Sequence, residues 1–443
     1  MSTRFIKINP ADNVVVAVDP LKKGDRLTVD GIEIVVAEDI PAGHKVALQD
    51  FAADEHIIKY GYPIGHARAA IAKGAWVNEK NIKTNLEGLL DYTYTPKLVD
   101  VSQPDKGLTF KGYRRKNGEV GVRNEIWIIP TVGCVNGVVN QLAEELRKET
   151  NGEGVDAIVS FPHNYGCSQL GNDHENTRKV LRDMVKHPNA GAVLVVGLGC
   201  ENNQMDAFKE LLGEIDEERV KFMVCQKVDD EFETGMSLLR ELYGKASKDV
   251  RVDVPLSELR VGLKCGGSDG FSGITANPLL GVFSDFLVSQ GGTTVLTEVP
   301  EMFGAETILM NRCGTPELFD KTVHLINDFK AYFMANNQPV YENPSPGNKA
   351  GGISTLEEKS LGCTQKCGKS IVRDVLMYGE RLKTKGLNLL SALVFFIVSS
   401  VLFVLSTFVF LLFFFFFNFF FFFFNNPPPP KFYPLPPPAL FPF

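Results

Sequence analysis

The sequence lacks any run of positive charge dense enough to follow a nucleic-acid backbone. Its 46 Lys and Arg residues and 53 Asp and Glu residues give a net charge of −7, and both signs are scattered along the chain. Proteins that bind nucleic acid gather Lys and Arg into a patch or stripe that faces the phosphates. We therefore expect no nucleic-acid partner.

The N-terminus lacks the features of a secretory signal. The opening stretch "MSTRFIKINPADNVVVAVDPL" has no basic segment followed by a continuous apolar segment and a small-residue cleavage site. This absence favours a reducing compartment, and we expect the protein to be cytoplasmic. The eight cysteines are then expected to be thiols or metal ligands rather than disulfides.

Charge is absent from Leu390 to Pro430, whereas residues before this stretch have ordinary globular composition. The last fifty or so residues hold more than half of the 33 phenylalanines, and a proline cluster follows them. Spanning a bilayer takes roughly 20 apolar residues, so a hydropathy scan predicts a transmembrane helix here.

Three features of residues 392–443 argue against a genuine membrane span. The run is nearly pure Phe, it has no basic cluster close behind it, and it ends in polyproline, which cannot continue a helix. Phe, Leu, Ser and Pro also share pyrimidine-rich codons. We interpret the segment as an aberrant low-complexity tail, and expect a membrane partner only if it is genuine.

The remaining pattern predicts an α/β protein with a small β domain at its N-terminus. Residues 1–97 hold short β-type runs separated by turn residues, and residues 98–111 are polar, Pro-containing and aperiodic, as in a linker. Apolar strands then alternate with amphipathic helices in residues 112–250 and 251–391. This alternation predicts a mainly parallel, βα-layered domain in two parts.

Cysteines recur at a fixed spacing in the α/β part. Cys134, Cys167 and Cys200 lie 33 residues apart, each in a loop after an apolar strand, and Cys265 follows 65 residues later. One βα unit has about this length, and carboxyl ends of parallel strands share one sheet edge, where ligands bind. The four thiols are therefore predicted to approach one crevice, although each taken alone could be a buried structural thiol.

Other polar residues accompany these cysteines in the same loops. His163 directly follows a strand, which makes it a candidate general base or ligand. His174 stands at an expected helix N-terminus, where it could face either a bound carboxylate or solvent. The stretch "KCGGSDG" adds Lys264, Ser268 and Asp269 among glycines that let a ligand approach the backbone.

The cysteine pair near the end of the α/β part and the charged residues beside it are weaker candidates for a site. Cys363 and Cys367 have C-x3-C spacing, which is a weaker metal signal than C-x2-C. The neighbouring charged side chains are expected to form a solvated helix entry; they are Glu357, Glu358, Lys366 and Lys369.

Several long motifs resemble the sugar-acid dehydratase family that contains altronate and galactarate dehydratases. They include "YGCSQLGNDHENTR", "GLKCGGSDGFSGITANPLLG", "GGTTVLTEVPEMFGAE" and "YENPSPGNKAGGISTLEEKSLGCTQK". The stretches "PAGHKVAL" and "KYGYPIGHA" are similar to that family's SAF-type β domain. The resemblance covers residues 1 to about 392 and stops where the apolar tail begins.

The resemblance implies a hydro-lyase that removes water from D-altronate to give 2-dehydro-3-deoxy-D-gluconate in hexuronate breakdown. Its partner would be a small-molecule sugar acid, and its favoured metal Fe²⁺, with Mn²⁺ as an alternative. A divalent metal that bridges the carboxylate and the departing hydroxyl would stabilise both developing charges. The sequence does not indicate an oligomeric state, and a homo-oligomer is compatible with it.

No residue roles are carried over from the family; the roles assigned here come from the argument about the sheet edge. The candidate catalytic residues are His163, Lys264, His174 and Asp269. The candidate metal ligands are Cys134, Cys167, Cys200, Cys265 and His44. The candidate substrate-binding residues are Asn164, Ser168, Gln169 and Ser268.

Three alternatives stay open from the sequence. The substrate could be galactarate or a related sugar acid. The loop thiols could instead hold an iron–sulfur cluster. If the apolar tail is genuine, the chain could be an inactive, membrane-attached and truncated relative.

Overall fold

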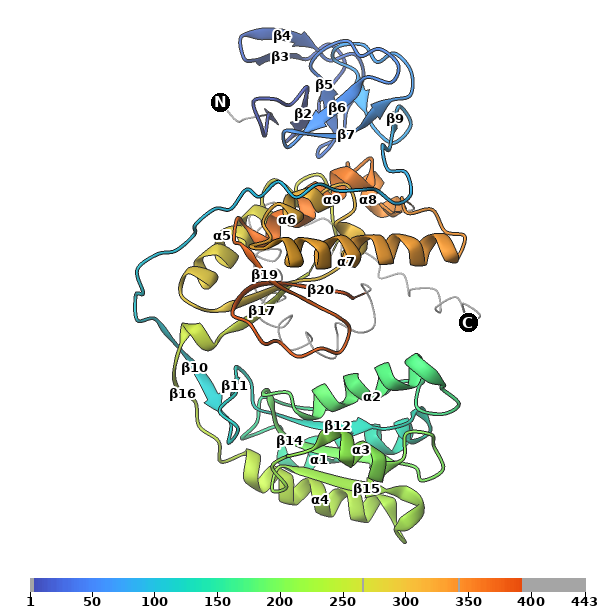
Figure 1. Cartoon of the computed structure of the whole chain (residues 1–443), viewed down its shortest axis with the longest axis vertical. Coiled ribbons are helices and arrows are strands. Elements are labelled where there is room, and N and C mark those ends of the chain that lie inside the picture. Colours follow the sequence, from blue (N-terminus) through green and yellow to red (C-terminus); the bar gives the residue numbers. More distant parts are fainter. Residues whose placement is uncertain (1–3, 265–266, 342, 393–443) are drawn as a thin grey trace.

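The computed structural model describes residues 4–264, 267–341 and 343–392. In order along the chain, these residues form a small β domain, a first α/β unit and a second α/β unit. Figure 1 shows that the second α/β unit lies between the other two. The predicted tail, from Leu393 onward, lies outside the described residues.

The N-terminal β domain consists of antiparallel strands in small sheets ordered β1-β2-β5-β8, β3-β4 and β6-β7-β9. Its central strand, β2, is apolar and buried along its whole length. The strands are β1 (Phe5–Ile6), β2 (Val14–Ala17), β3 (Arg26–Val29), β4 (Ile32–Val35), β5 (Lys45–Ala47), β6 (His56–Lys59), β7 (Tyr62–Ala67), β8 (Trp76–Val77) and β9 (Ile82–Lys83). The prediction of a mostly-β N-terminal domain is confirmed.

Residues 84–108 carry no helix or strand and run along the second α/β unit (Figure 1). Tyr92 donates a hydrogen bond to Glu306 at 2.6 Å, and Tyr94 donates one to the main-chain carbonyl of Cys313 at 2.7 Å. These contacts tie the connecting segment to the unit beneath it.

The first α/β unit is a four-stranded parallel sheet with the order β13-β12-β14-β15. Separate apolar clusters, one under α1 and α4 and one under α2 and α3, cover its two faces. Its strands are β12 (Glu125–Pro130), β13 (Ala157–Ser160), β14 (Ala190–Gly197) and β15 (Val220–Val224). Its helices are α1 (Asn136–Thr150), α2 (Gly171–Val185), α3 (Met205–Leu212) and α4 (Glu231–Ala246).

A short antiparallel ribbon separates the two α/β units. It has the strand order β11-β10-β16 and is built from β10 (Thr109–Arg114), β11 (Val120–Gly121) and β16 (Val252–Pro255). Because β16 leaves the first unit to pair with β10, the chain cannot continue the first sheet and starts a second one.

The second α/β unit is another four-stranded parallel sheet, with the order β17-β18-β20-β19. Its strands are β17 (Arg260–Leu263), β18 (Thr293–Leu296), β19 (Val372–Leu376) and β20 (Gly386–Leu390). Its helices are α5 (Ala276–Ser289), α6 (Glu306–Met310), α7 (Pro316–Ala335), α8 (Pro346–Ala350) and α9 (Leu356–Thr364). The predicted α/β class with parallel strands is confirmed, with two sheets where one was expected.

Short 3₁₀ helices follow β12, β15 and β18 of the two parallel sheets, β16 of the ribbon and helix α9. They are η1 (Gly133–Val135), η2 (Cys225–Lys227), η3 (Leu256–Glu258), η4 (Val299–Glu301) and η5 (Gln365–Cys367). Within the described ranges, none of the helices combines the length and the apolar character needed to cross a membrane.

Candidate active site

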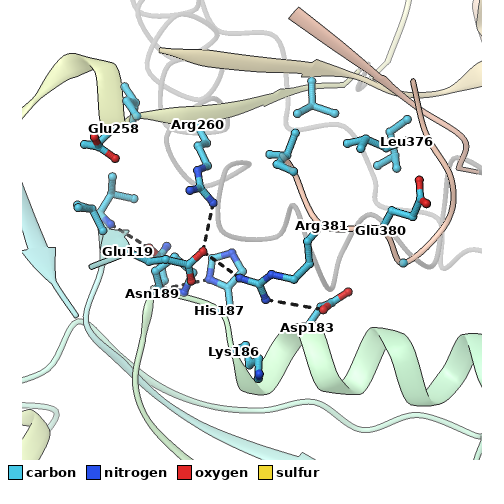
Figure 2. Close-up of a pocket in the computed structure, with 18 of the residues that line it drawn as sticks. Glu119, Asp183, Lys186, His187, Asn189, Glu258, Arg260, Leu376, Glu380 and Arg381 are labelled. Carbon is cyan, nitrogen blue, oxygen red and sulfur yellow. Dashed lines mark hydrogen bonds and ion pairs between the residues drawn. The ribbon is translucent and has the colours of Figure 1, made fainter. Parts of the chain in front are cut away.

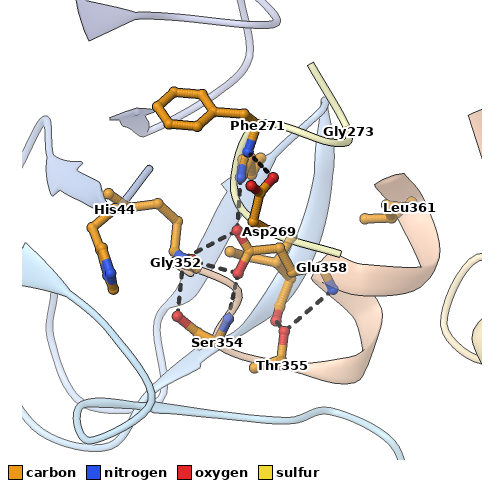
Figure 3. A network of polar contacts seen from close by, with 12 residues as sticks. His44, Asp269, Phe271, Gly273, Gly352, Ser354, Thr355, Glu358 and Leu361 are labelled. Carbon is orange, nitrogen blue, oxygen red and sulfur yellow. Dashed lines mark hydrogen bonds and ion pairs between the residues drawn. The ribbon is translucent and has the colours of Figure 1, made fainter. Parts of the chain in front are cut away.

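Buried charges gather where the β domain meets α9. The Glu358 carboxylate accepts hydrogen bonds from Lys45 Nζ at 2.8 and 3.0 Å and from Lys59 Nζ at 2.7 Å. The side chains of Lys45 and Glu358 are 0% exposed. Figure 3 shows Glu358 beside Ser354, whose main-chain N–H also donates to the carboxylate, at 2.8 Å. Two strands of the β domain thus meet one helix of the second α/β unit through ion pairs.

The two lysines keep Glu358 ionised. Burial alone would raise the pKa of its carboxyl, but the Lys45 and Lys59 ammonium groups outweigh burial and hold that pKa at about 2. Burial has the opposite effect on a cation, and it lowers the pKa of Lys45 to about 8 against the attraction of Glu358.

Further ion pairs line the carboxyl edge of the second sheet. Glu298 and Glu301 follow β18, and they pair with Lys366 at 3.2 Å and Lys359 at 2.8 Å. Burial would raise the pKa of Glu301, but Lys366 and Lys359 outweigh it and the pKa is lowered. Cys363 Sγ also donates to Glu301, at 3.2 Å. Two carboxylates and two ammonium groups are thus held within the protein at one edge of the sheet.

A cavity opens beside these pairs, between the β domain, the loop after β17 and α9. The residues around it are Tyr60, Ser268, Asp269, Ser272, Gly273, Asn277, Ile353, Glu358, Lys359, Gly362 and Cys363. Most of them carry polar or ionisable groups. The cavity's volume of about 10 Å³ has room for one water molecule, and its lining favours polar, anionic groups.

The carboxylate of Asp269 is oriented by its own loop. Its Oδ1 accepts hydrogen bonds from the main-chain N–H of Phe271 at 3.0 Å, from the N–H of Ser272 at 2.8 Å and from Ser272 Oγ at 2.8 Å. Figure 3 shows this turn next to the Glu358 network. An exposed carboxylate at the cavity, fixed through one oxygen, suits a general base.

Other predicted residues lie at this junction. Ser268 is 6% exposed and lines the cavity, and its carbonyl accepts from Asn348 Nδ2 at 2.7 Å. Lys264 is exposed and directly follows β17. Cys265 lies outside the described residues. The strand before it belongs to the second sheet, whereas the strands before Cys134, Cys167 and Cys200 belong to the first.

His44 also lies here, and its ring is engaged on both sides. Its Nε2 lies 3.0 Å from the carbonyl of Ala350, and its Nδ1 accepts from Trp76 Nε1 at 3.1 Å. Burial lowers the pKa of His44. With Nε2–H donating and Nδ1 accepting, the neutral ring braces the β domain against the segment that precedes α9.

Glycines let three backbone segments meet beside His44. A Cβ placed on Gly270 or on Gly352 would lie 2.1 or 2.2 Å from the carbonyl oxygen of Gly43, so neither position has room for a side chain. We predicted that glycines in the "KCGGSDG" stretch let a ligand approach. At Gly270 the close approach is made instead by another part of the chain.

The other predicted residues gather at the carboxyl edge of the first sheet. Cys134, Cys167 and Cys200 are exposed free thiols on the successive loops after β12, β13 and β14. The loops contact one another, since Gly133 N–H donates to the carbonyl of Tyr165 at 2.9 Å and Asn202 Nδ2 donates to that of Gln169 at 3.3 Å. The three thiols therefore lie on adjacent loops at one sheet edge, and a shared crevice there stays a prediction.

His163 uses both ring nitrogens at this sheet edge. Its Nε2 lies 2.8 Å from the carbonyl of Pro130, and its Nδ1 accepts from the N–H of Tyr165 at 3.1 Å. Burial lowers the pKa of His163 below its usual value. The geometry fits a neutral ring that braces the loop.

The remaining candidates surround His163. Asn164 and Ser168 are exposed, and Gln169 Oε1 accepts from the N–H of Gly166 at 3.1 Å. His174 stands in the first turn of α2, and its Nδ1 is buried without a hydrogen-bond partner among the described residues.

The described residues do not fit a preformed metal centre. Within residues 4–264, 267–341 and 343–392, no group of three or more His, Cys, Asp or Glu side chains is arranged so that it could hold a metal ion. The three exposed thiols lie on adjacent loops, yet they form no such group.

A larger cavity separates the two α/β units (Figure 2). Its charged side chains pair across it, since Glu119 meets Arg260 at 3.4 Å and Arg381 at 2.9 Å. None of the residues that we predicted from the sequence lines this cavity. These ion pairs join the ribbon to the second unit, and Arg381 also lies 3.8 Å from Asp183 of the first unit, so the charges of this cavity hold the units together.

The prediction of a solvated entry to α9 is wrong for three of its four residues. Glu357, Glu358 and Lys366 are 3%, 1% and 1% exposed, and only Lys369 is exposed. Glu357 accepts from Thr84 Oγ1 at 2.9 Å, and burial raises its pKa. Every residue of α9 is buried, because β7 of the β domain packs on it and η4 and α5 of the second α/β unit also contact it.

The same site contains residues that the sequence did not single out, namely Lys45, Lys59 and Tyr60 from the β domain and Lys359 and Glu301 from the second unit. One signal was present: the stretch "LEEKSLGCT" is helical but has no apolar stripe, which is unusual for a helix with one exposed face.

Comparison with protein families accounts for almost the whole described chain. Residues 3–85 match the altronate/galactarate dehydratase SAF domain. Residues 112–247 match the second domain of D-galactarate dehydratase/altronate hydrolase, and residues 256–414 match the C-terminal domain of D-galactarate/altronate dehydratase.

Individual relatives agree with these matches. The altronate dehydratases of Bacillus subtilis (strain 168) and Escherichia coli (strain K12) are each 58% identical, over 389 and 390 residues, which is 88% of this chain and 78% and 79% of theirs. The galactarate dehydratase (L-threo-forming) of Escherichia coli (strain K12) is 35% identical over 399 residues, 86% of this chain and 76% of its own. The chain therefore belongs to the altronate/galactarate dehydratase family of carbon–oxygen hydro-lyases, which dehydrate sugar acids.

Proposed function

We propose that this enzyme dehydrates D-altronate to 2-dehydro-3-deoxy-D-gluconate, a step of hexuronate breakdown in the cytoplasm. One observation carries the choice of substrate: identity is 58% to two altronate dehydratases and 35% to a galactarate dehydratase. The three alignments cover similar shares of this chain, so the difference in identity is not an effect of length.

The chemistry requires a base, an acid and positive charge. The base removes the proton from C2, beside the carboxylate, and negative charge then develops on the enediolate. The C3 hydroxyl must receive a proton as it departs. Ammonium groups in a site that excludes water stabilise such charge more than they would in solution.

The cavity under the SAF domain, as we now name the N-terminal β domain, offers groups for the base and for the positive charge. Asp269, oriented through Oδ1, is assigned as the base for the C2 proton. Lys359 lines the same cavity and is 7% exposed, and Glu301 and Asn343 hold its ammonium group at 2.8 and 3.0 Å. We assign Lys359 to stabilise the charge of the enediolate.

Fe²⁺ as the metal, with Mn²⁺ as an alternative, is a prediction from the resemblance to the family. Bound Fe²⁺ would supply a Lewis acid for the substrate oxygens. The described side chains form no group that fits such an ion. The roles assigned to Asp269 and Lys359 therefore rest on the chain's own proton and charge chemistry.

The test is an assay of the purified full chain with D-altronate and with galactarate, each with Fe²⁺, with Mn²⁺ and with a chelator. Product is identified by mass spectrometry as the substrate minus one water. We expect a higher kcat/KM for altronate than for galactarate. The opposite ranking would reassign the substrate, and absence of turnover with either acid would contradict the proposal.

A second candidate function is that of an iron–sulfur protein, for which the exposed thiols on adjacent loops of the first sheet would have to draw together, because they form no metal-holding group with other described residues as they stand. Visible absorption of anaerobically purified protein separates the two. A broad charge-transfer band favours a cluster, and a colourless, active enzyme excludes it.

A further inference from the structure

Tyr60 reaches from the SAF domain into the cavity of the second α/β unit. It lines that cavity, and its hydroxyl lies between the loop after β17 and helix α9. A Cβ on Gly273 would lie 2.3 Å from Tyr60 Oη, and one on Gly362 would lie 3.8 Å from it. A residue with a side chain at position 273 would therefore displace the phenol.

The backbone at Tyr60 is unusual for an aromatic residue. Tyr60 and Gly61 form the two-residue loop between β6 and β7, and their φ angles are +60° and +80°. Hairpin loops with positive φ at both positions favour Asn-Gly or Gly-Gly, because a side chain is strained there. A tyrosine at this position directs a long side chain out of the hairpin, towards the cavity, in spite of the strain.

The surroundings keep the phenol protonated near neutral pH. The hydroxyl end is enclosed, and burial raises the pKa of Tyr60 above its usual value. Lys59 Nζ lies 4.8 Å from the centroid of the ring and favours a single ring position. The phenol is thus a positioned proton donor on the same cavity as Asp269.

We propose that Tyr60 is a catalytic residue of the dehydration and gives its proton to the departing C3 hydroxyl. This assignment rests on the proposed function. Asp269 takes the C2 proton, and the electron pair of that C–H bond forms the C2=C3 double bond. The C3–O bond breaks with its electrons on oxygen, which takes the phenol proton and leaves as water.

The second half of the reaction returns the protons. The enol loses its 2-hydroxyl proton to the Tyr60 phenolate, and the proton held by Asp269 is delivered to C3. The product is the 2-keto-3-deoxy acid, and both side chains recover their starting states. No oxidant or further reactant is needed.

The test uses Tyr60→Phe in the full chain, which removes one oxygen atom and keeps the ring. We expect kcat for D-altronate to fall by about 10²–10⁴-fold, the usual contribution of a general acid. The second substrate is 3-deoxy-3-fluoro-D-altronate, whose fluoride leaves without needing a proton. The Phe variant should process it within about threefold of the wild-type rate. Tyr62→Phe is the matched control, because Tyr62 lies in the same hairpin and is 47% exposed.

The outcomes separate this role from the proposed function. An active wild type with an unaffected Tyr60→Phe variant overturns the role of Tyr60 and leaves the function in place. Equal losses on altronate and on the fluoro analogue also overturn the role, since they indicate that the phenol only shapes the cavity. A wild type that turns over neither substrate overturns the function, and the role of Tyr60 with it.

Discussion

Replacing Glu358 with Gln should loosen the SAF domain from the second α/β unit. The carboxylate accepts hydrogen bonds from Lys45, Lys59 and the N–H of Ser354, and both members of the Lys45 pair are fully buried. Gln has nearly the same shape but no charge. Two buried ammonium groups would then face each other without a counter-charge.

The size of the effect follows from two independent arguments. The pKa of Glu358 is lowered from 4.5 to about 2 in the folded protein. At 1.36 kcal/mol per unit, this difference stabilises the folded state by about 3 kcal/mol. Because the folded pKa is the lower one, this stability is present above pH 4.5 and is lost as pH falls towards 2. Removing one partner of a buried ion pair typically costs about 3–5 kcal/mol, which agrees.

Hydrogen exchange measures the lost stability at individual amides. This local measurement suits a chain of several units better than one global unfolding curve does. Amides of β5 and β6 should exchange roughly 10²- to 10⁴-fold faster in Glu358→Gln, since each 1.36 kcal/mol is tenfold. The matched control is Glu33→Gln, which breaks an ion pair with Arg26 whose side chains are 72% (Arg26) and 56% (Glu33) exposed. The control should change exchange by less than about fivefold. Exchange of β5 and β6 within about threefold of wild type in Glu358→Gln would refute the reasoning.

Three further predictions concern other parts of the molecule. His163→Ala should speed hydrogen exchange in the loop after β13, because both ring nitrogens of His163 already bind main-chain groups. It should lower kcat less than Asp269→Asn does; the reverse order would make His163 the base. The family resemblance predicts that chelation lowers turnover and that Fe²⁺ restores more of it than Mn²⁺; activity that survives exhaustive chelation contradicts a metal requirement. Ser in place of Cys134 should leave bound iron, measured by elemental analysis, unchanged, because the exposed thiols form no metal-holding group among the described residues. The pKa of Lys45 falls from 10.5 to about 8 on folding, so its protonation opposes folding below 8 and this penalty is relieved as pH rises. Opening free energies of β5 amides, from hydrogen exchange at pH 7 and pH 9, should therefore show a gain of about 1 kcal/mol in wild type that Lys45→Met lacks; equal gains in the two proteins would contradict it.

The local pattern of apolar residues was sufficient to predict the strands and helices in which these residues recur regularly. The apolar runs that became β12, β13, β14, β15, β17 and β18 each directly precede a polar loop, and all lie in parallel sheets as expected. Strands β19 and β20 were not anticipated. The sequence of β19, "VRDVL", carries two charges in five residues, and it is recognisable as a strand only through its parallel pairing with β20.

The 33-residue spacing of the cysteines stopped predicting their positions where the chain leaves the first sheet. The 33-residue period holds for Cys134, Cys167 and Cys200, whose strands share one sheet. Extending it to Cys265 assumed that the sheet continues, but β16 leaves to pair with β10. A regular spacing in the sequence indicates repeated βα units, but it does not indicate which sheet each unit joins.

Long-range pairing explains why the charged residues of α9 were misjudged. Glu358 is separated from Lys45 and Lys59 by 313 and 299 residues. Locally, "LEEKS" is indistinguishable from the exposed start of a helix, since Glu in the first turn is favourable there in any case. Only the packing of the SAF domain on α9 turns these charges into buried pairs.

Elimination of water also limits where the catalytic groups can be. The base and the acid act on adjacent carbon atoms, and each must come within hydrogen-bond reach, about 2.6–3.2 Å, of its own proton. Asp269 and Tyr60 line one cavity from opposite domains, as a base and an acid that act on adjacent carbons must. His163 lies at the edge of the other sheet, in a different unit of the chain. An acid from the SAF domain and a base from the second α/β unit therefore require the SAF domain to stay docked during turnover, so Glu358→Gln should lower kcat as well as stability.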